Sequence, residues 1–237
     1  MIFAVIRNKS TRWFSNGSNK VAGFNESKIP REDEVTSTIF GTMKYLNPQG
    51  IFELFNEMAG DNDIRTCNSM KIELWPRSFE LSHRQHVEPD AIFTFRLQHS
   101  EIKSFILEVK WLRYEYGENQ LEDQWSAFGV RDPKNTRLVY ISSSSDKFNL
   151  FKKSKNKNWS ALTWYEFSTI LSKQTCSDAN TSSFFRDIHL MLSQFNTKPF
   201  EGFSNFHLRK NKVRELSMEI LKYEFKYTSK ANVEWGI

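Results

Sequence analysis

The feature of this sequence that most constrains its fold is a pair of apolar runs separated by a short polar segment. The runs are AIFTFRL at 91–97 and SFILEVKW at 104–111, with QHSEIK between them. Both are rich in β-branched and aromatic residues, which favour strands, and the polar segment is short enough for a hairpin turn. We therefore expect two antiparallel neighbouring strands of one sheet.

Two helices are predicted on the N-terminal side of this hairpin. Apolar residues recur at helical spacing over 34–46, where Asn47-Pro48 ends the pattern, and again over 51–58, before Gly60. A strand-like stretch follows at 71–80. The residues that form the two helical stripes are Val35, Ile39, Met43 and Leu46, then Ile51, Leu54, Phe55 and Met58.

Helices also dominate the part of the chain that follows the hairpin. A helical pattern at 119–128 precedes RLVYIS at 137–142, a short apolar run that reads as a buried strand. Thr163 and Glu166 have the spacing of a capping box, which predicts the start of a helix. Apolar stripes near 185–195 and 213–223 predict two further helices.

This order of elements predicts an α/β fold: a mixed central sheet flanked by helices, with additional C-terminal helices. We expect an N-terminal strand and irregular arm at 1–30 and a core at 31–145. A basic loop and a helical extension packed on the core are expected at 146–237.

The composition agrees with a folded domain that needs no disulfides. Apolar residues make up 39% of the 237 positions, and 21 are phenylalanine, which is enough for a substantial core. The two cysteines, Cys67 and Cys176, have no CxxC spacing, which argues against a cysteine zinc site. No stretch suits a signal peptide or a membrane span, so we expect a cytoplasmic protein with no membrane partner.

Three chemically notable side chains lie near the ends of the predicted hairpin strands. Glu108 and Lys110 are two residues apart, so on a strand they face the same side of the sheet. Asp90 opens the neighbouring strand, and the hairpin can bring it across from Glu108. An acid and an amine inside apolar strands cost free energy unless they have partners.

A hard divalent cation would explain this set of side chains. Two carboxylates from adjacent strands, Asp90 and Glu108, can share Mg²⁺ or Mn²⁺, and the carbonyl of Val109 offers a further oxygen ligand. A metal-bound water attacks a phosphodiester, and the amine of Lys110 can stabilise the charge that develops on the phosphate. The same three groups could instead form a salt bridge at the end of a strand, without catalysis.

The Pro89-Asp90 pair followed by Glu108-Val109-Lys110 resembles the PD-(D/E)XK nuclease superfamily, which has the restriction-endonuclease-like fold. The order of predicted elements over 31–142 is similar to the α-β-β-β-α-β core of that superfamily. The resemblance implies that Asp90 and Glu108 are metal ligands and that Lys110 is the catalytic lysine.

Two further parts of the site are implied by the same resemblance. Many members carry an acid on the first helix, for which Glu34 is the matching candidate and Glu32 and Asp33 are competitors. Many also carry a glutamine on the helix after the lysine. Gln120 and Gln124 lie four residues apart and so on one helical face, and the sequence does not choose between them.

The resemblance implies a Mg²⁺-dependent endonuclease that hydrolyses DNA, in restriction, phage defence, mobile-element biology or repair. The net charge of +5 and the basic loop are compatible with DNA as partner. Candidate phosphate contacts are Lys152, Lys153, Lys155, Lys157 and His86. The alternative is an inactive nuclease-fold module that binds nucleic acid or protein, or an interaction protein with a chance motif match.

Other enzyme classes lack support in the sequence. It contains no GxSxG, no HExxH and no glycine-rich phosphate loop, so we expect no nucleotide cofactor. The chain is compatible with a homodimer.

Overall fold

The structure is a computed structural model that describes residues 31–78, 86–111, 119–142, 156–193 and 195. The chain divides into two compact units, 1–198 and 199–237, and all described residues belong to the first. Several predicted features lie outside the described residues: the arm at 1–30, the last helix near 213–223, and Lys152, Lys153 and Lys155.

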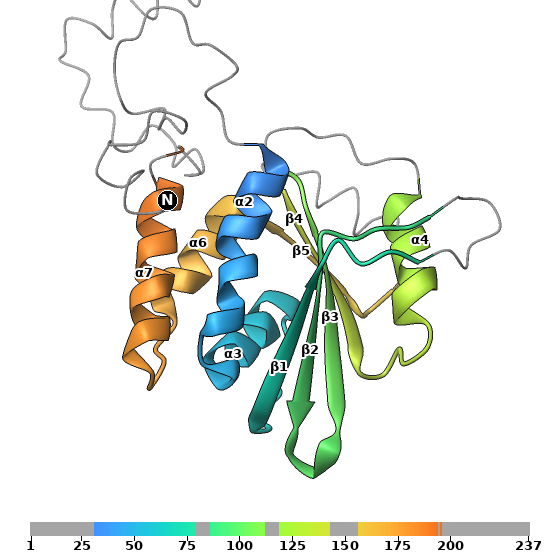
Figure 1. Ribbon diagram of the computed structural model, residues 1–237, viewed down its shortest axis with the longest axis horizontal. Coiled ribbons are helices and arrows are strands. Elements are labelled where there is room, and N and C mark those ends of the chain that lie inside the picture. Colours follow the sequence, from blue (N-terminus) through green and yellow to red (C-terminus); the bar gives the residue numbers. More distant parts are fainter. Residues whose placement is uncertain (1–30, 79–85, 112–118, 143–155, 194, 196–237) are drawn as a thin grey trace, which may run out of the picture. The chain divides into compact units, whose positions relative to one another are not determined.

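The fold is α/β, with a five-stranded mixed sheet in the order β1-β2-β3-β4-β5 and helices on its faces (Figure 1). The first three strands form an antiparallel meander, whereas β3, β4 and β5 run parallel. The strands are β1 Cys67–Leu74, β2 Ala91–Leu97, β3 Ile102–Val109, β4 Thr136–Ser142 and β5 Trp159–Thr163. The predicted hairpin is confirmed, and its turn places His99 and Ser100 at positive φ, 60° and 62°.

The N-terminal helices follow the predicted apolar stripes, with one difference. The stripe over 34–46 forms two elements, α2 (Glu32–Ile39) and the 3-10 helix η2 (Gly41–Tyr45). Gly41 lies close to the sheet, because a Cβ there would be 3.0 Å from Leu74 Cδ1. Close approach of this segment to β1 coincides with the change of helix type.

The next helix, α3 (Pro48–Ala59), ends before Gly60 as predicted and begins three residues earlier than the predicted stripe at 51–58. The Asn47 side chain accepts a hydrogen bond from Gly50 N at 3.1 Å, and Pro48 occupies the first helical position. Gly60 ends the helix with φ 69°, a left-handed conformation that glycine adopts without steric cost.

The helix after β3 is short and changes its winding. It consists of α4 (Gln120–Gln124) and a π-helical turn, η4 (Trp125–Gly129). The ring of Trp125 packs so closely on Gly129 that an added Cβ would lie 2.4 Å from it. The predicted helix over 119–128 is therefore present, and a residue larger than glycine at position 129 would displace the indole.

The C-terminal helices are α6 (Trp164–Lys173) and α7 (Ala179–Ser193). The predicted capping box is confirmed, because Thr163 Oγ1 accepts from Glu166 N and Glu166 Oε2 accepts from Thr163 N. The strand before it, β5, was not predicted. Its five residues, WSALT, follow a lysine-rich polar stretch, and a run this short carries little alternation.

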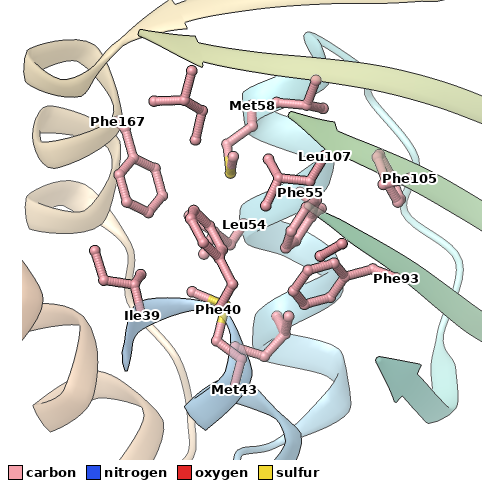
Figure 2. Packing of buried hydrophobic residues seen from close by; sticks show 14 of the residues in the cluster. Ile39, Phe40, Met43, Leu54, Phe55, Met58, Phe93, Phe105, Leu107 and Phe167 are labelled. Carbon is pink, nitrogen blue, oxygen red and sulfur yellow. The ribbon is translucent and has the colours of Figure 1, made fainter. Parts of the chain in front are cut away.

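The main core lies between the sheet and helices α2, α3, α6 and α7 (Figure 1). It is rich in phenylalanine: the ring centroid of Phe55 lies 4.2 Å from that of Phe93 and 5.3 Å from that of Phe105. Figure 2 shows these three side chains gathered in the core. Phe40 and Phe167 pack beside them. A smaller cluster covers the other face, beneath α4 and η4. No described helix has the length and apolar character to cross a membrane.

Candidate active site

The hairpin register places Asp90 opposite Glu108. Ala91 pairs with Leu107, so the residue before Ala91 (Asp90) and the residue after Leu107 (Glu108) face each other at the end of the two strands. Paired residues on antiparallel strands project to the same face of a sheet, which is also the face of Lys110. The structure thus brings the three side chains of the PD…ExK pattern together.

Asp90 completes the hydrogen bonding at the end of the hairpin. Its Oδ2 accepts the backbone N–H of Val109 at 2.7 Å. This N–H points towards β2, where a strand would offer a carbonyl, so the carboxylate substitutes for a ladder partner. The Asp90 side chain is 7% exposed, and its hydrogen bond to Val109 N fixes it relative to β3.

Glu108 is nearly inaccessible, at 1% exposure, and is surrounded by nitrogen donors. Lys110 Nζ lies 2.6 Å from Oε1, which also accepts from Gln120 Nε2 at 2.7 Å. Gln124 Nε2 donates to Oε2 at 2.7 Å. The sequence left the choice between the two glutamines open, and the structure brings both to the same carboxylate.

The first helix contributes Glu32 to this group. Its Oε1 lies 3.0 Å from Lys110 Nζ, and its Oε2 accepts from Trp111 N at 3.0 Å. Glu34, the preferred candidate from sequence, accepts from the backbone N–H of Arg31 at 3.1 Å and so caps the helix. The acid that contacts Lys110 is therefore the competitor, two residues earlier.

The backbone of Lys110 is held from both sides. Its N–H donates to Ile141 O on β4 at 2.7 Å, and its carbonyl accepts from Trp164 Nε1 at 3.0 Å. The Trp111 ring packs edge-on against Trp164 with centroids 4.9 Å apart. Sequence reasoning missed Trp164, and a tryptophan in the first turn of a helix gives no local signal of such a contact.

Burial and like charge control the ionisation of the two carboxyl groups. Burial, then the negative charge of Glu108, raise the pKa of Asp90 to about 8. Burial also raises the pKa of Glu108, although Lys110 and the Gln124 hydrogen bond oppose this. Burial alone would lower the pKa of Lys110, but Glu108 and Glu32 raise it above its usual value. The lysine is therefore a cation at neutral pH.

Two of the predicted phosphate contacts, His86 and Lys157, are among the described residues, and Lys157 lies in the turn before β5. It precedes Trp159, which pairs with Leu138, whereas the site lies towards the Thr163 end of that strand. Through Tyr140, Glu108 is level with Ala161, so Lys157 lies in the turn four positions ahead of that level. His86 is exposed, four residues before Asp90.

The donor chemistry of the group fits a hard divalent cation. Asp90, Glu108 and Glu32 supply carboxylate oxygens, and the first two repel one another when both are ionised. In the described residues, no cluster of three or more His, Cys, Asp or Glu side chains is arranged as a ready-made metal site. Glu108 instead contacts Lys110 and the glutamines, so metal binding requires this carboxylate to exchange partners.

Comparisons with known proteins identify no relative of this chain. No family model matches the sequence, and neither a curated protein nor a solved structure gives a significant match.

Proposed function

We propose that this protein is a metal-dependent endonuclease that hydrolyses DNA phosphodiester bonds, built on a restriction-endonuclease-like core of the PD-(D/E)XK type. One observation carries the proposal: at the end of the hairpin, Asp90 lies opposite Glu108, and Lys110 Nζ is 2.6 Å from Glu108 Oε1. The element order α2, α3, β1–β3, α4, β4, which has one helix more than an α-β-β-β-α-β core, supports it.

Asp90 and Glu108 would hold Mg²⁺ or Mn²⁺, with the carbonyl of Val109 and the acid from α2, Glu32, as further oxygen donors. When bound, the ion lowers the pKa of a coordinated water and neutralises charge on a phosphate oxygen. Lys110 is the one cation among these side chains. It keeps its proton because of Glu108 and Glu32, and can stabilise the developing negative charge.

Gln120 and Gln124 have a positioning role in this scheme. Their Nε2 atoms, each 2.7 Å from a Glu108 oxygen, fix the rotation of the carboxylate at the centre of the group. The amides carry no charge, so they orient Glu108 without competing with a cation for its charge. Their place on α4 ties the site to the helix that follows β3.

A second candidate is an inactive nuclease-fold module that binds nucleic acid or protein. The observation in its favour is the closed contact network around Glu108, in which Lys110 and both glutamines already satisfy the carboxylate. A buried pair that is fully hydrogen-bonded can be retained for structural reasons alone.

Plasmid cleavage separates the two candidates. The wild-type chain is incubated with supercoiled DNA in EDTA, Mg²⁺, Mn²⁺ or Ca²⁺, beside Glu108→Gln as the matched inactive control. We expect nicked or linear DNA with Mg²⁺ or Mn²⁺ only. Ca²⁺ binds with looser geometry and should support little turnover. Cleavage in EDTA, or equal cleavage by Glu108→Gln, would refute the proposal.

A further inference from the structure

The strand β1 forms one edge of the sheet (Figure 1). It pairs with β2 on one side, and within the described residues no strand pairs with its other side. An edge strand presents a row of backbone donors and acceptors that can pair with another chain. Which residues present these groups follows from the hydrogen-bond pattern of the meander.

Alternate residues of β1 direct their backbone groups to β2. Trp75 N donates to Asp90 O at 3.0 Å, and an antiparallel ladder repeats this bonding every second residue. Glu73 and Lys71 therefore bond to β2, and the residues between them, above all Ile72, direct their N–H and C=O groups outward. Leu97 N donates to Glu101 O at 2.8 Å across the next pair, in agreement with this phase.

The side chains of β1 divide into an apolar and a charged row. Met70, Ile72 and Leu74 pack against the main core and are partly buried. Lys71 and Glu73 lie on the opposite face, with side chains 69% and 46% exposed and their charged atoms 3.0 Å apart. The charged row faces the same side of the sheet as the candidate active site, because Glu73 pairs with Ile92 and Asp90 lies two residues before that.

This stretch is self-complementary under a two-fold axis at Ile72. When a second copy pairs in antiparallel orientation, Ile72 lies opposite its own equivalent and Met70 opposite Leu74. Lys71 then lies opposite Glu73 of the second copy, and the reverse holds at the symmetry-related pair. Opposite charges directly across antiparallel strands stabilise the pairing.

We infer that β1 is a homodimer interface, through which two copies join their sheets edge to edge. The outward backbone groups of Met70, Ile72 and Leu74 form the ladder, the apolar row extends the core, and two Lys71–Glu73 pairs fix the register. The interface is isologous, as a two-fold dimer requires. Charged side chains on an edge strand can also prevent it from pairing with another chain. If Lys71 and Glu73 act in that way, the protein is a monomer.

Charge reversal tests the interface, with sedimentation velocity on the full chain between about 1 and about 100 µM as the measurement. Lys71→Glu places Glu opposite Glu, and Glu73→Lys places Lys opposite Lys, so each variant alone should associate at least about tenfold more weakly. An equimolar mixture of the two restores opposite charges across the axis and should form a heterodimer. Thermal unfolding of each variant checks that it folds.

The mixture distinguishes the interface from an effect within one chain. Each variant has lost its own Lys71–Glu73 contact, so a defect confined to the monomer would persist on mixing. Lys173→Glu, an exposed lysine at the end of α6, is the matched control and should leave association unchanged. A monomeric wild-type chain over the whole range, or a dimer that both reversals leave intact, would overturn the inference. Neither result bears on DNA cleavage.

Discussion

Lys110 Nζ and Glu108 Oε1 lie 2.6 Å apart, yet substitutions at the two positions are expected to have different consequences. Glu108→Ala removes a metal ligand and should abolish both metal binding and cleavage. Lys110→Ala removes a charge stabiliser and should lower the cleavage rate on the order of 10²–10³-fold while metal affinity is largely kept. Calorimetric metal titration beside cleavage rates checks this, and an equal loss of affinity in both variants would contradict separate roles.

Glu32 and Glu34 form a matched pair on one helical turn. Glu32 contacts Lys110 and the backbone of Trp111, whereas Glu34 caps α2 through Arg31 N. We expect Glu32→Gln to lower cleavage at least tenfold. Glu34→Gln should cleave normally and lose only about 0.3–1 kcal/mol of stability, the usual effect of an acid in a first helical turn. If Glu34→Gln lowered the cleavage rate more than Glu32→Gln did, Glu34 and not Glu32 would be the acid of the site.

At the scale of elements, α6 supports the site through one hydrogen bond. Trp164→Phe keeps an aromatic ring against Trp111 but removes the N–H that binds the Lys110 carbonyl. The loss should cost about 1 kcal/mol of unfolding free energy. Cleavage should also fall with substrate affinity unchanged, because the lysine is less firmly placed. An unchanged rate with the same loss of stability would make this contact purely structural.

The sequence predicted the central elements because their patterns are strong. The hairpin has two long apolar runs, and α3 has a regular apolar stripe that stops before Gly60. The element β5 was missed because WSALT is too short to show alternation after a lysine-rich stretch. The strand predicted at 71–80 lies at Cys67–Leu74, because Trp75 adopts φ 50° and ends it before Pro76.

As with the fold, only part of the candidate site could be predicted from the sequence. The positions of Asp90, Glu108 and Lys110 follow from strand period and hairpin register, which the sequence carries. The contact of Glu32 depends on how the start of α2 is placed over the end of the sheet, a tertiary property. Trp164 binds Lys110 across 54 positions of sequence, and no local pattern encodes such a contact.

At the scale of the whole molecule, the buried carboxyl pair makes stability depend on pH. The pKa of Asp90 is about 8 in the folded chain and about 3.9 when unfolded, so the folded state holds a proton that unfolding releases. Its contribution is therefore present at about pH 4 and is lost as the pH rises towards 8. The metal-free protein should lose up to a few kcal/mol from this group over that range.

Chemical denaturation in EDTA at pH 5 and pH 8 measures this dependence. Asp90→Asn keeps an oxygen that can accept from Val109 N but cannot ionise. The unfolding free energy of the variant relative to that of the wild type should therefore be higher at pH 8 than at pH 5. A constant difference between the two proteins would show that Asp90 is not the titrating group.

The central claim is that Asp90 and Glu108 together hold one divalent cation. Calorimetric titration with Mn²⁺ in EDTA-free buffer tests it without reference to any substrate. We predict one ion per chain, bound more tightly as the pH rises to about 8, because the ion must displace the proton on Asp90. Asp90→Asn and Glu108→Gln should each lose this binding, and Glu34→Gln should keep it. No saturable Mn²⁺ binding by the wild-type chain at pH 8, or equal binding by all four proteins, would contradict the claim.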